Sequence, residues 1–128
     1  MKLLIRENGS ETARSLFRSA SELVSTSLAY IEARSALGRM EREGRLTRSG
    51  AKRARVDLEW IWAELHAVRL DDSLVLRAAD ATELLRLRAG DAIHVSSALS
   101  FGAPELVFAT WDGELRRAAL ESGLAVAP

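Results

Sequence analysis

Apolar residues recur at intervals of three and four along two neighbouring segments, and this spacing predicts two amphipathic helices. The first helix is expected from Ser27 to Gly44, and the second from Thr47 to about Ala67. The first has its apolar positions at Ala29, Tyr30, Ala33, Ala36, Leu37 and Met40. A short glycine-containing turn separates the two segments, so the pattern predicts a helical hairpin.

The rest of the chain alternates between short helical patterns and short apolar runs. Helices are expected from Ser10 onward, with Ser10 as the cap, and over residues 72–87, 90–101 and 112–122. Strands are expected at residues 22–26, 68–70, 105–109 and 124–126. Strands that alternate with helices favour an α/β fold with a parallel sheet flanked by helices and right-handed crossovers.

Composition narrows the class of protein. The 128 residues are enough for a single domain, and the absence of cysteine excludes disulfides, thiolate metal sites and thiol nucleophiles. Two histidines cannot form a multi-histidine zinc site. The early apolar run Leu3-Leu4-Ile5 is too short for a signal peptide or a membrane span, so we expect a cytoplasmic protein with no membrane partner.

The charge is balanced overall but not locally. Residues 1 to 56 carry 12 basic and 6 acidic side chains, whereas residues 57 to 128 carry 6 basic and 12 acidic ones. Seven cations fall on the predicted hairpin: Arg39, Arg42, Arg45, Arg48, Lys52, Arg53 and Arg55. This cluster is expected to contact either RNA phosphates or an acidic protein partner, although a solvated helical surface with local Arg–Glu pairs explains it equally well.

Three carboxylates lie where ligands gather in parallel α/β folds, near the junctions of strands and following helices. Asp112 follows the strand that ends at Ala109, Asp91 follows Gly90 at a helix start, and Glu32 lies in the first turns of its helix. Asp91 and Asp112 also suit the simple role of helix N-caps. Grouped carboxylates repel one another, and a hard divalent cation such as Mg²⁺ or Mn²⁺ relieves that repulsion. Such an ion can activate water against a phosphodiester, so a metal-dependent nuclease fits the pattern.

Three segments in order carry a family resemblance: residues 27–37 (SLAYIEARSAL), 90–99 (GDAIHVSSAL) and 110–115 (TWDGEL). In order and spacing they resemble the motifs of PIN-domain ribonucleases of the VapC toxin type. The resemblance implies a PIN-like three-layer fold with a protruding hairpin, and a Mg²⁺- or Mn²⁺-dependent endoribonuclease. It also implies a cognate antitoxin, an RNA substrate and a homodimer.

The resemblance assigns roles residue by residue. Glu32, Asp91 and Asp112 would be the metal-binding catalytic acids, and Thr110 would support the catalytic site by hydrogen bonding. Ser27 and Arg34 would contact the metal-binding residues without binding the metal themselves. His94 is expected to be structural, because imidazole suits a hard-metal oxygen site poorly.

The start of the chain departs from the family pattern. The family opens with a central strand that carries a first acid, and this chain resembles only the end of that stretch, with Met1 and Lys2 as its last pair. One such strand contributes on the order of 10 kcal/mol of apolar burial, comparable to a whole domain's stability. We therefore expect one PIN-like domain over residues 1–128, truncated at its N-terminus. An upstream start is favoured over replacement of the strand by another segment, or over a decayed remnant.

Two alternative functions stay open from the sequence. One is a catalytically impaired PIN-like module that binds an antitoxin or RNA without cleaving it. The other is a helical DNA-binding regulator that uses the basic hairpin, which the alternating strands and the lack of a recognition helix disfavour. Trp60 and Trp62 are two residues apart, about 200° around a helix, so one of them is expected to face outward and mark a dimer or antitoxin contact.

Overall fold

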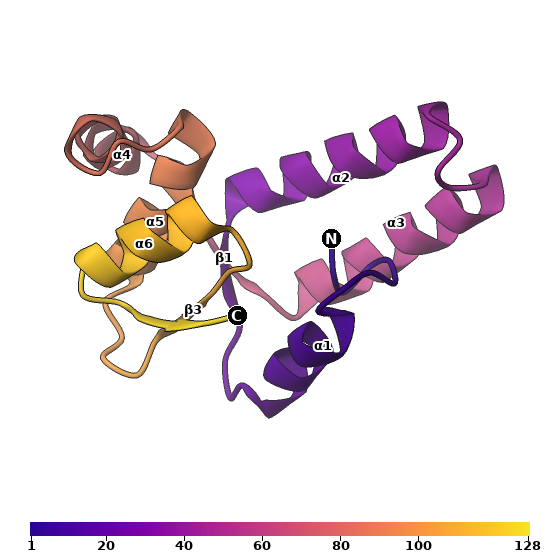
Figure 1. Ribbon diagram of the computed structural model, residues 1–128, viewed down its shortest axis with the longest axis horizontal. Helices are drawn as coiled ribbons and strands as arrows, with labels where there is room; N and C mark the ends of the chain where they lie inside the picture. The colour runs from indigo at the N-terminus through magenta and orange to yellow at the C-terminus, as the bar shows by residue number, and fades with distance from the viewer. The chain divides into compact units, whose positions relative to one another are not determined.

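The computed structural model describes residues 1–128 and shows six helices with four short strands (Figure 1). The elements in order are α1 (Ser10–Ser19), β1 (Val24–Thr26), α2 (Ser27–Arg42), α3 (Arg48–Ala63), β2 (His66–Val68), α4 (Asp72–Leu84), α5 (Ala89–Phe101), β3 (Val107–Ala109), α6 (Gly113–Glu121) and β4 (Ala125–Ala127). The α/β alternation predicted from the sequence is confirmed. The chain forms two compact units, one of Met1–Leu23 with Ala29–His66 and one of Val24–Leu28 with Ala67–Pro128.

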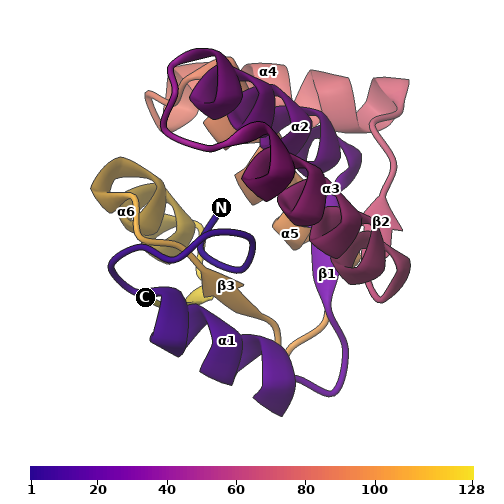
Figure 2. The same ribbon diagram turned by 90° about the vertical axis from the view of Figure 1, so that its right-hand side faces the viewer.

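The first unit is built around the predicted hairpin, which is confirmed. Helices α2 and α3 run antiparallel side by side (Figures 1 and 2), and their shared core contains Leu37, Ala54 and Leu58. The turn between α2 and α3 is formed by residues that favour turns and helix starts. Gly44 adopts a left-handed backbone with φ of 70°, and the Thr47 hydroxyl accepts the Gly50 amide at 3.1 Å to cap α3. Local sequence signals therefore set both ends of this turn.

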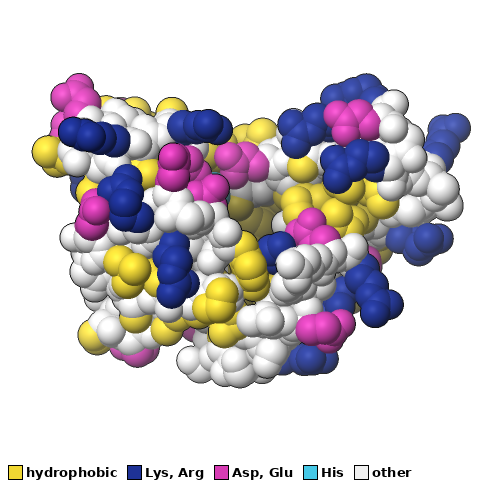
Figure 3. Space-filling model, viewed as in Figure 1, with side chains coloured by type: hydrophobic (Ala, Val, Ile, Leu, Met, Phe, Trp, Pro, Cys, Tyr) yellow, Lys and Arg dark blue, Asp and Glu magenta, His cyan; other side chains and the backbone are white.

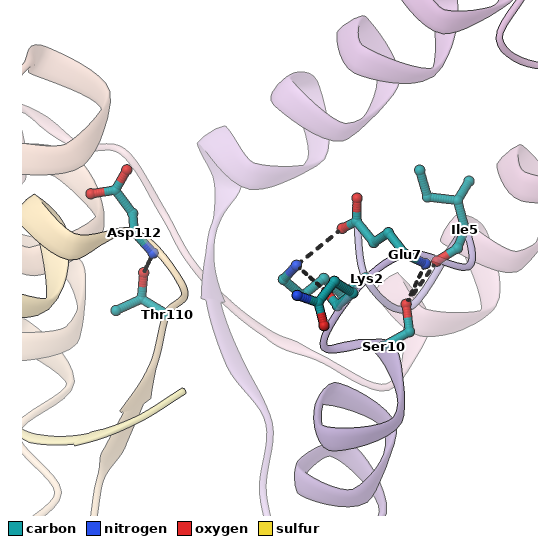
Figure 4. Close-up of polar contacts among 7 residues, drawn as sticks. Lys2, Ile5, Glu7, Ser10, Thr110 and Asp112 are labelled. Atoms are coloured by element: carbon teal, nitrogen blue, oxygen red, sulfur yellow. Dashed lines mark hydrogen bonds and ion pairs between the residues drawn. The ribbon is translucent and has the colours of Figure 1, made fainter.

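The opening residues pack on the hairpin and form no strand. Leu4 and Ile5 pack against its core, in a turn that is held by the Leu4 and Ile5 amides donating to the Met1 carbonyl. The expected cap of α1 is wrong, because Gly9 is the N-cap and Ser10 is the first helical residue. The Ser10 hydroxyl instead accepts the Glu7 amide at 2.9 Å and donates to the Ile5 carbonyl at 3.1 Å (Figure 4). Ser10 thus fixes the turn that precedes α1.

The second unit has a core rich in small residues. Its buried cluster lies on α4, α5, α6 and the segment before α5, with Leu85, Ile93 and Phe108 packed at the edge. The buried members are Ala78, Ala81, Leu87, Ala92, Val95, Leu115 and Ala118. Alanines let helices approach closely, so α4 and α5 pack along each other and α5 also contacts α6 and β1. The unit is therefore organised around α5.

The strands form two separate pairs, β1 with β2 and β3 with β4. Strands β3 and β4 are parallel, with Val107 opposite Ala125 and Ala109 opposite Ala127. Strand β2 begins at His66, two residues earlier than expected, which ends α3 at Ala63 instead of Ala67. No helix is both long enough and apolar enough to cross a membrane.

Candidate active site

The loop between β3 and α6 holds two of the predicted site residues. Thr110 is buried, and its amide donates to the Ala127 carbonyl at 3.0 Å, which extends the β3–β4 pairing by one bond. Its hydroxyl accepts the Asp112 amide at 3.1 Å (Figure 4). The sheet therefore fixes Thr110, and Thr110 in turn fixes the backbone of Asp112.

Asp112 is the N-cap of α6, so the simple capping role considered from the sequence is real. One carboxylate oxygen, Oδ1, accepts the Leu115 amide at 2.9 Å. Asp112 is nonetheless exposed, and its second oxygen can serve another ligand. Capping holds the side chain in one orientation at the positive end of the helix dipole. The same carboxylate can thus cap the helix and bind a cation.

Asp91 lies in the first turn of α5, in the same unit as Asp112. It is half-buried, and it does not cap α5, whose N-cap is Arg88 with no side-chain cap bond. Because Asp91 does not cap the helix, the start of α5 does not require an aspartate at this position. An anion in the first turn gains a modest benefit from the helix dipole. The Asp91 carboxylate therefore has no capping role like that of Asp112. The absence of a capping role favours a role in ligand binding.

Ser27 also belongs to the second unit, at the junction of β1 and α2. Its hydroxyl donates to the Val68 carbonyl at 3.0 Å and so links this junction to the end of β2. This hydrogen bond fixes the start of α2 against the end of β2. Thr26, the residue before it, is almost fully buried at 2% exposure.

Glu32 and Arg34 lie on α2 in the first unit; Glu32 is exposed, and the Arg34 side chain is 45% exposed. Arg34 donates to Glu59 of α3 at 3.2 Å and to the Tyr30 hydroxyl at 3.3 Å, and Tyr30 itself donates to Glu59 at 2.6 Å. Sequence reasoning missed this network, because residues 29 positions apart meet only through the register of the hairpin. Arg34 thus braces α2 against α3. Convergence of Glu32 with Asp91 and Asp112 stays a prediction.

The chemistry of these donors fits a hard divalent cation. Carboxylate and hydroxyl oxygens are the ligands that Mg²⁺ and Mn²⁺ prefer. Asp91 and Asp112 supply two carboxylates in the second unit, and Asp112 has a preset orientation. No three His, Cys, Asp or Glu side chains are grouped as metal ligands in the structure. His94 lies one turn after Asp91 on α5 and is half-buried, and its structural role stays a prediction.

The basic cluster gathers at the turn end of the hairpin, where dark blue side chains crowd the surface (Figure 3). Arg55 is half-buried in an ion pair with Glu41, and Arg45 pairs with Glu43 at 3.6 Å. The alternative of local Arg–Glu pairs therefore applies to Arg45 and Arg55. The exposed positive surface is extended by Arg39, Arg42, Arg48, Lys52 and Arg53.

The two tryptophans of α3 point in different directions, as their spacing predicts. Trp62 is half-buried and contacts the Tyr30 ring of α2, with ring centroids 5.2 Å apart. Trp60 is 71% exposed. The outward residue that the sequence could not select is therefore Trp60.

Comparison with known proteins places this chain in a family. The model of the PIN domain matches residues 1–121. The chain belongs to the PIN-domain family, in agreement with its motifs and its α/β fold.

Two curated relatives place the chain among VapC-type members of that family. It is 38% identical over 128 residues to ribonuclease VapC45 of Mycobacterium tuberculosis (strain CDC 1551 / Oshkosh). It is also 38% identical over 128 residues to ribonuclease VapC49 of Mycobacterium tuberculosis (strain ATCC 25618 / H37Rv). The matches span 100% of this chain and 89% of each relative.

Proposed function

We propose that this protein is a Mg²⁺- or Mn²⁺-dependent endoribonuclease and the toxin component of a toxin–antitoxin pair. The observation that carries the proposal is 38% identity along the whole chain to two proteins named as ribonucleases. The β3–α6 loop supports it, because Thr110 and the α6 N-terminus hold the Asp112 carboxylate in place while leaving one oxygen available. A catalytic metal site requires this kind of fixed carboxylate.

The carboxylates of Glu32, Asp91 and Asp112 would hold the cation. When bound, the ion lowers the pKa of a water molecule and offsets negative charge that develops on the phosphodiester. Thr110 keeps the Asp112 backbone in register through its hydroxyl. Ser27 fixes the junction of β1 and α2 through Val68, and Arg34 fixes α2 through Glu59. Thr110, Ser27 and Arg34 are therefore positioning residues, each acting through a neighbour.

The partners we propose follow from charge and family. RNA is the substrate, and the exposed cations of the hairpin supply favourable contacts for its phosphates. A cognate antitoxin protein, a homodimeric state and a cytoplasmic location complete the proposal. An antitoxin with an acidic segment would compete with RNA for the same cations, which offers a simple means of inhibition.

The decisive experiment compares two aspartates that perform the same structural task. Asp71 caps α4 by accepting the Leu74 amide at 2.8 Å, just as Asp112 caps α6. Asparagine is an equally good N-cap, so Asp71→Asn and Asp112→Asn both preserve their helices. Cleavage of a fluorescent RNA with Mn²⁺ should fall at least about 100-fold for Asp112→Asn and stay unchanged for Asp71→Asn.

Three outcomes would count against the proposal. Cleavage that survives Asp112→Asn would remove Asp112 from the site. Equal losses in both variants would show that only capping matters. RNA binding by the unmodified chain without any cleavage would favour the alternative, an impaired PIN-like module that binds its partners.

A further inference from the structure

The β3–α6 loop carries one large aromatic side chain next to the carboxylate of Asp112. Trp111 lies between Thr110 and Asp112 in the sequence, and it is 41% exposed. At this exposure the side chain is partly covered by protein and partly open to solvent. Aromatic residues are enriched where proteins bind partners, and they form the surfaces on which single-stranded nucleic acids stack. The position of Trp111 beside a proposed catalytic acid makes it a candidate for a contact with the substrate.

Hydrogen bonds fix the backbone on both sides of Trp111. The Thr110 amide donates to the Ala127 carbonyl at 3.0 Å. The Thr110 hydroxyl accepts the Asp112 amide at 3.1 Å, a bond that spans Trp111 (Figure 4). Asp112 in turn caps α6 by accepting the Leu115 amide at 2.9 Å. Tryptophan has only two side-chain torsions, so on a fixed backbone it has little conformational freedom to lose when a flat ligand packs on its ring.

The charges of this part of the chain do not by themselves attract RNA. Residues 57 to 128 carry 6 basic and 12 acidic side chains, so on balance they repel phosphates. One exposed cation lies close to the loop, because Arg116 follows Asp112 by one turn of α6. Its neighbour Arg117 is held by a bond to the Leu85 carbonyl at 2.8 Å. Further affinity for RNA at this loop has to come from an uncharged contact, and base stacking is such a contact, since every base has a flat aromatic face.

We infer that Trp111 is a base-stacking residue that binds an unpaired base of the RNA beside the Asp112 carboxylate, while Arg116 contacts an adjoining phosphate. Bases within a duplex are already stacked and paired, so such a residue selects single-stranded segments. Stacking depends on the size of the base and not on its hydrogen-bonding edge, so adenine should bind more tightly than uracil. The inference rests on the proposed function, because it takes RNA as the substrate of the site that contains Asp112. It adds the feature of the RNA that the loop recognises.

Affinities for RNA with and without bases test the stacking directly. Fluorescence anisotropy in EDTA, where cleavage does not interfere, is measured with oligoadenylate, oligouridylate, an RNA duplex and an abasic ribose-phosphate chain, each about ten nucleotides long. Repulsion by the carboxylates is common to all probes, so the ratio of affinities isolates the base. Trp111→Leu should weaken binding of oligoadenylate at least about fivefold and leave binding of the abasic chain unchanged. Trp111→Phe keeps an aromatic face and should retain most of the affinity. Leu120→Ala on α6, at a position 53% exposed, is the control and should leave all affinities unchanged.

Salt dependence separates the stacking contact from the phosphate contact. Trp111→Leu should lower the affinity for oligoadenylate by the same factor at every salt concentration, because stacking releases no counterions. Arg116→Gln should instead reduce the slope of log affinity against log salt by about 0.7. Circular dichroism confirms that each variant folds.

The inference would be overturned by an absence of oligonucleotide binding, by an unchanged affinity of Trp111→Leu, or by equal losses for oligoadenylate and the abasic chain. A loss in Trp111→Phe as large as that in Trp111→Leu would also overturn it. Cleavage by the unmodified chain with Mn²⁺ is measured separately. Cleavage without a preference for bases would remove the stacking residue and leave the nuclease, whereas a preference for bases without cleavage would do the reverse.

Discussion

The two units of this protein have similar cores but different surfaces. The hairpin unit buries Leu37 and Leu58 together with small residues, and it fastens its surface with the Tyr30–Glu59–Arg34 network. The second unit likewise buries large apolar side chains among the alanines of α4, α5 and α6. The first unit also carries most of the cations, whereas Asp91 and Asp112 lie in the second. Under the proposed function, the hairpin would contact partners, and the second unit would hold two of the three catalytic acids.

Removal of divalent cations should have the largest effect, and it should lower the rate of RNA cleavage without changing the fold. With EDTA, RNA cleavage is expected to drop at least about 100-fold, because carboxylates cannot activate water as a bound cation does. Circular dichroism should stay unchanged, since both cores are apolar and independent of the ion. Added Mn²⁺ should restore cleavage. Full activity in EDTA would contradict the assignment of metal ligands to Glu32, Asp91 and Asp112.

Truncation of the hairpin core should have the largest effect on stability. Leu37→Ala removes a fully buried side chain and should lower the free energy of unfolding by about 2–5 kcal/mol. Urea denaturation followed by circular dichroism measures the change. Leu84→Ala, at a position 81% exposed, should change it by less than about 0.5 kcal/mol. Similar values for the two variants would show that the hairpin core contributes little to folding.

Neutralising the turn of the hairpin should weaken RNA binding moderately. The double variant Arg42→Gln/Arg48→Gln is expected to reduce the slope of log affinity against log salt by about 1.4, if both side chains contact phosphates of single-stranded RNA. The control is Arg69→Gln/Arg77→Gln in the second unit, where both arginines are exposed. Filter binding at several salt concentrations gives the slopes. Equal slopes in both double variants would remove the RNA contact from the hairpin turn.

The smallest expected effect concerns the hydrogen bond that joins α2 to α3. Tyr30→Phe removes the 2.6 Å bond to Glu59 but keeps the ring that packs on Trp62. Stability in urea should fall by about 0.5–1.5 kcal/mol. Because Glu59 also binds Arg34, Arg34→Gln combined with Tyr30→Phe should cost less than the sum of the two single changes if the network is cooperative. Strict additivity would show that the two bonds act independently.

The sequence by itself determined the order of the elements and where most helices begin. Helical periodicity places α2 and α3, and Thr47, Asp71 and Asp112 mark helix starts through bonds to amides three residues on. These signals are local, so they can be recognised in the sequence without knowledge of contacts between distant residues. The motifs around Glu32, Asp91 and Asp112 likewise indicated the family that comparison then confirmed. Where local signals were weak, the predictions missed: the cap of α1 is Gly9 and not Ser10, and β2 begins at His66 and not at Val68.

Tertiary structure alone decided the contacts between residues far apart in the chain. It turned Trp60 outward and Trp62 toward Tyr30, and it joined Arg34 to Glu59. It also paired β3 with β4 in a register that holds Thr110, and hence Asp112, in place. Spacing in the sequence gives the face on which a side chain lies, but which partner it meets depends on how separate elements pack, and that packing is fixed only when the whole core is buried.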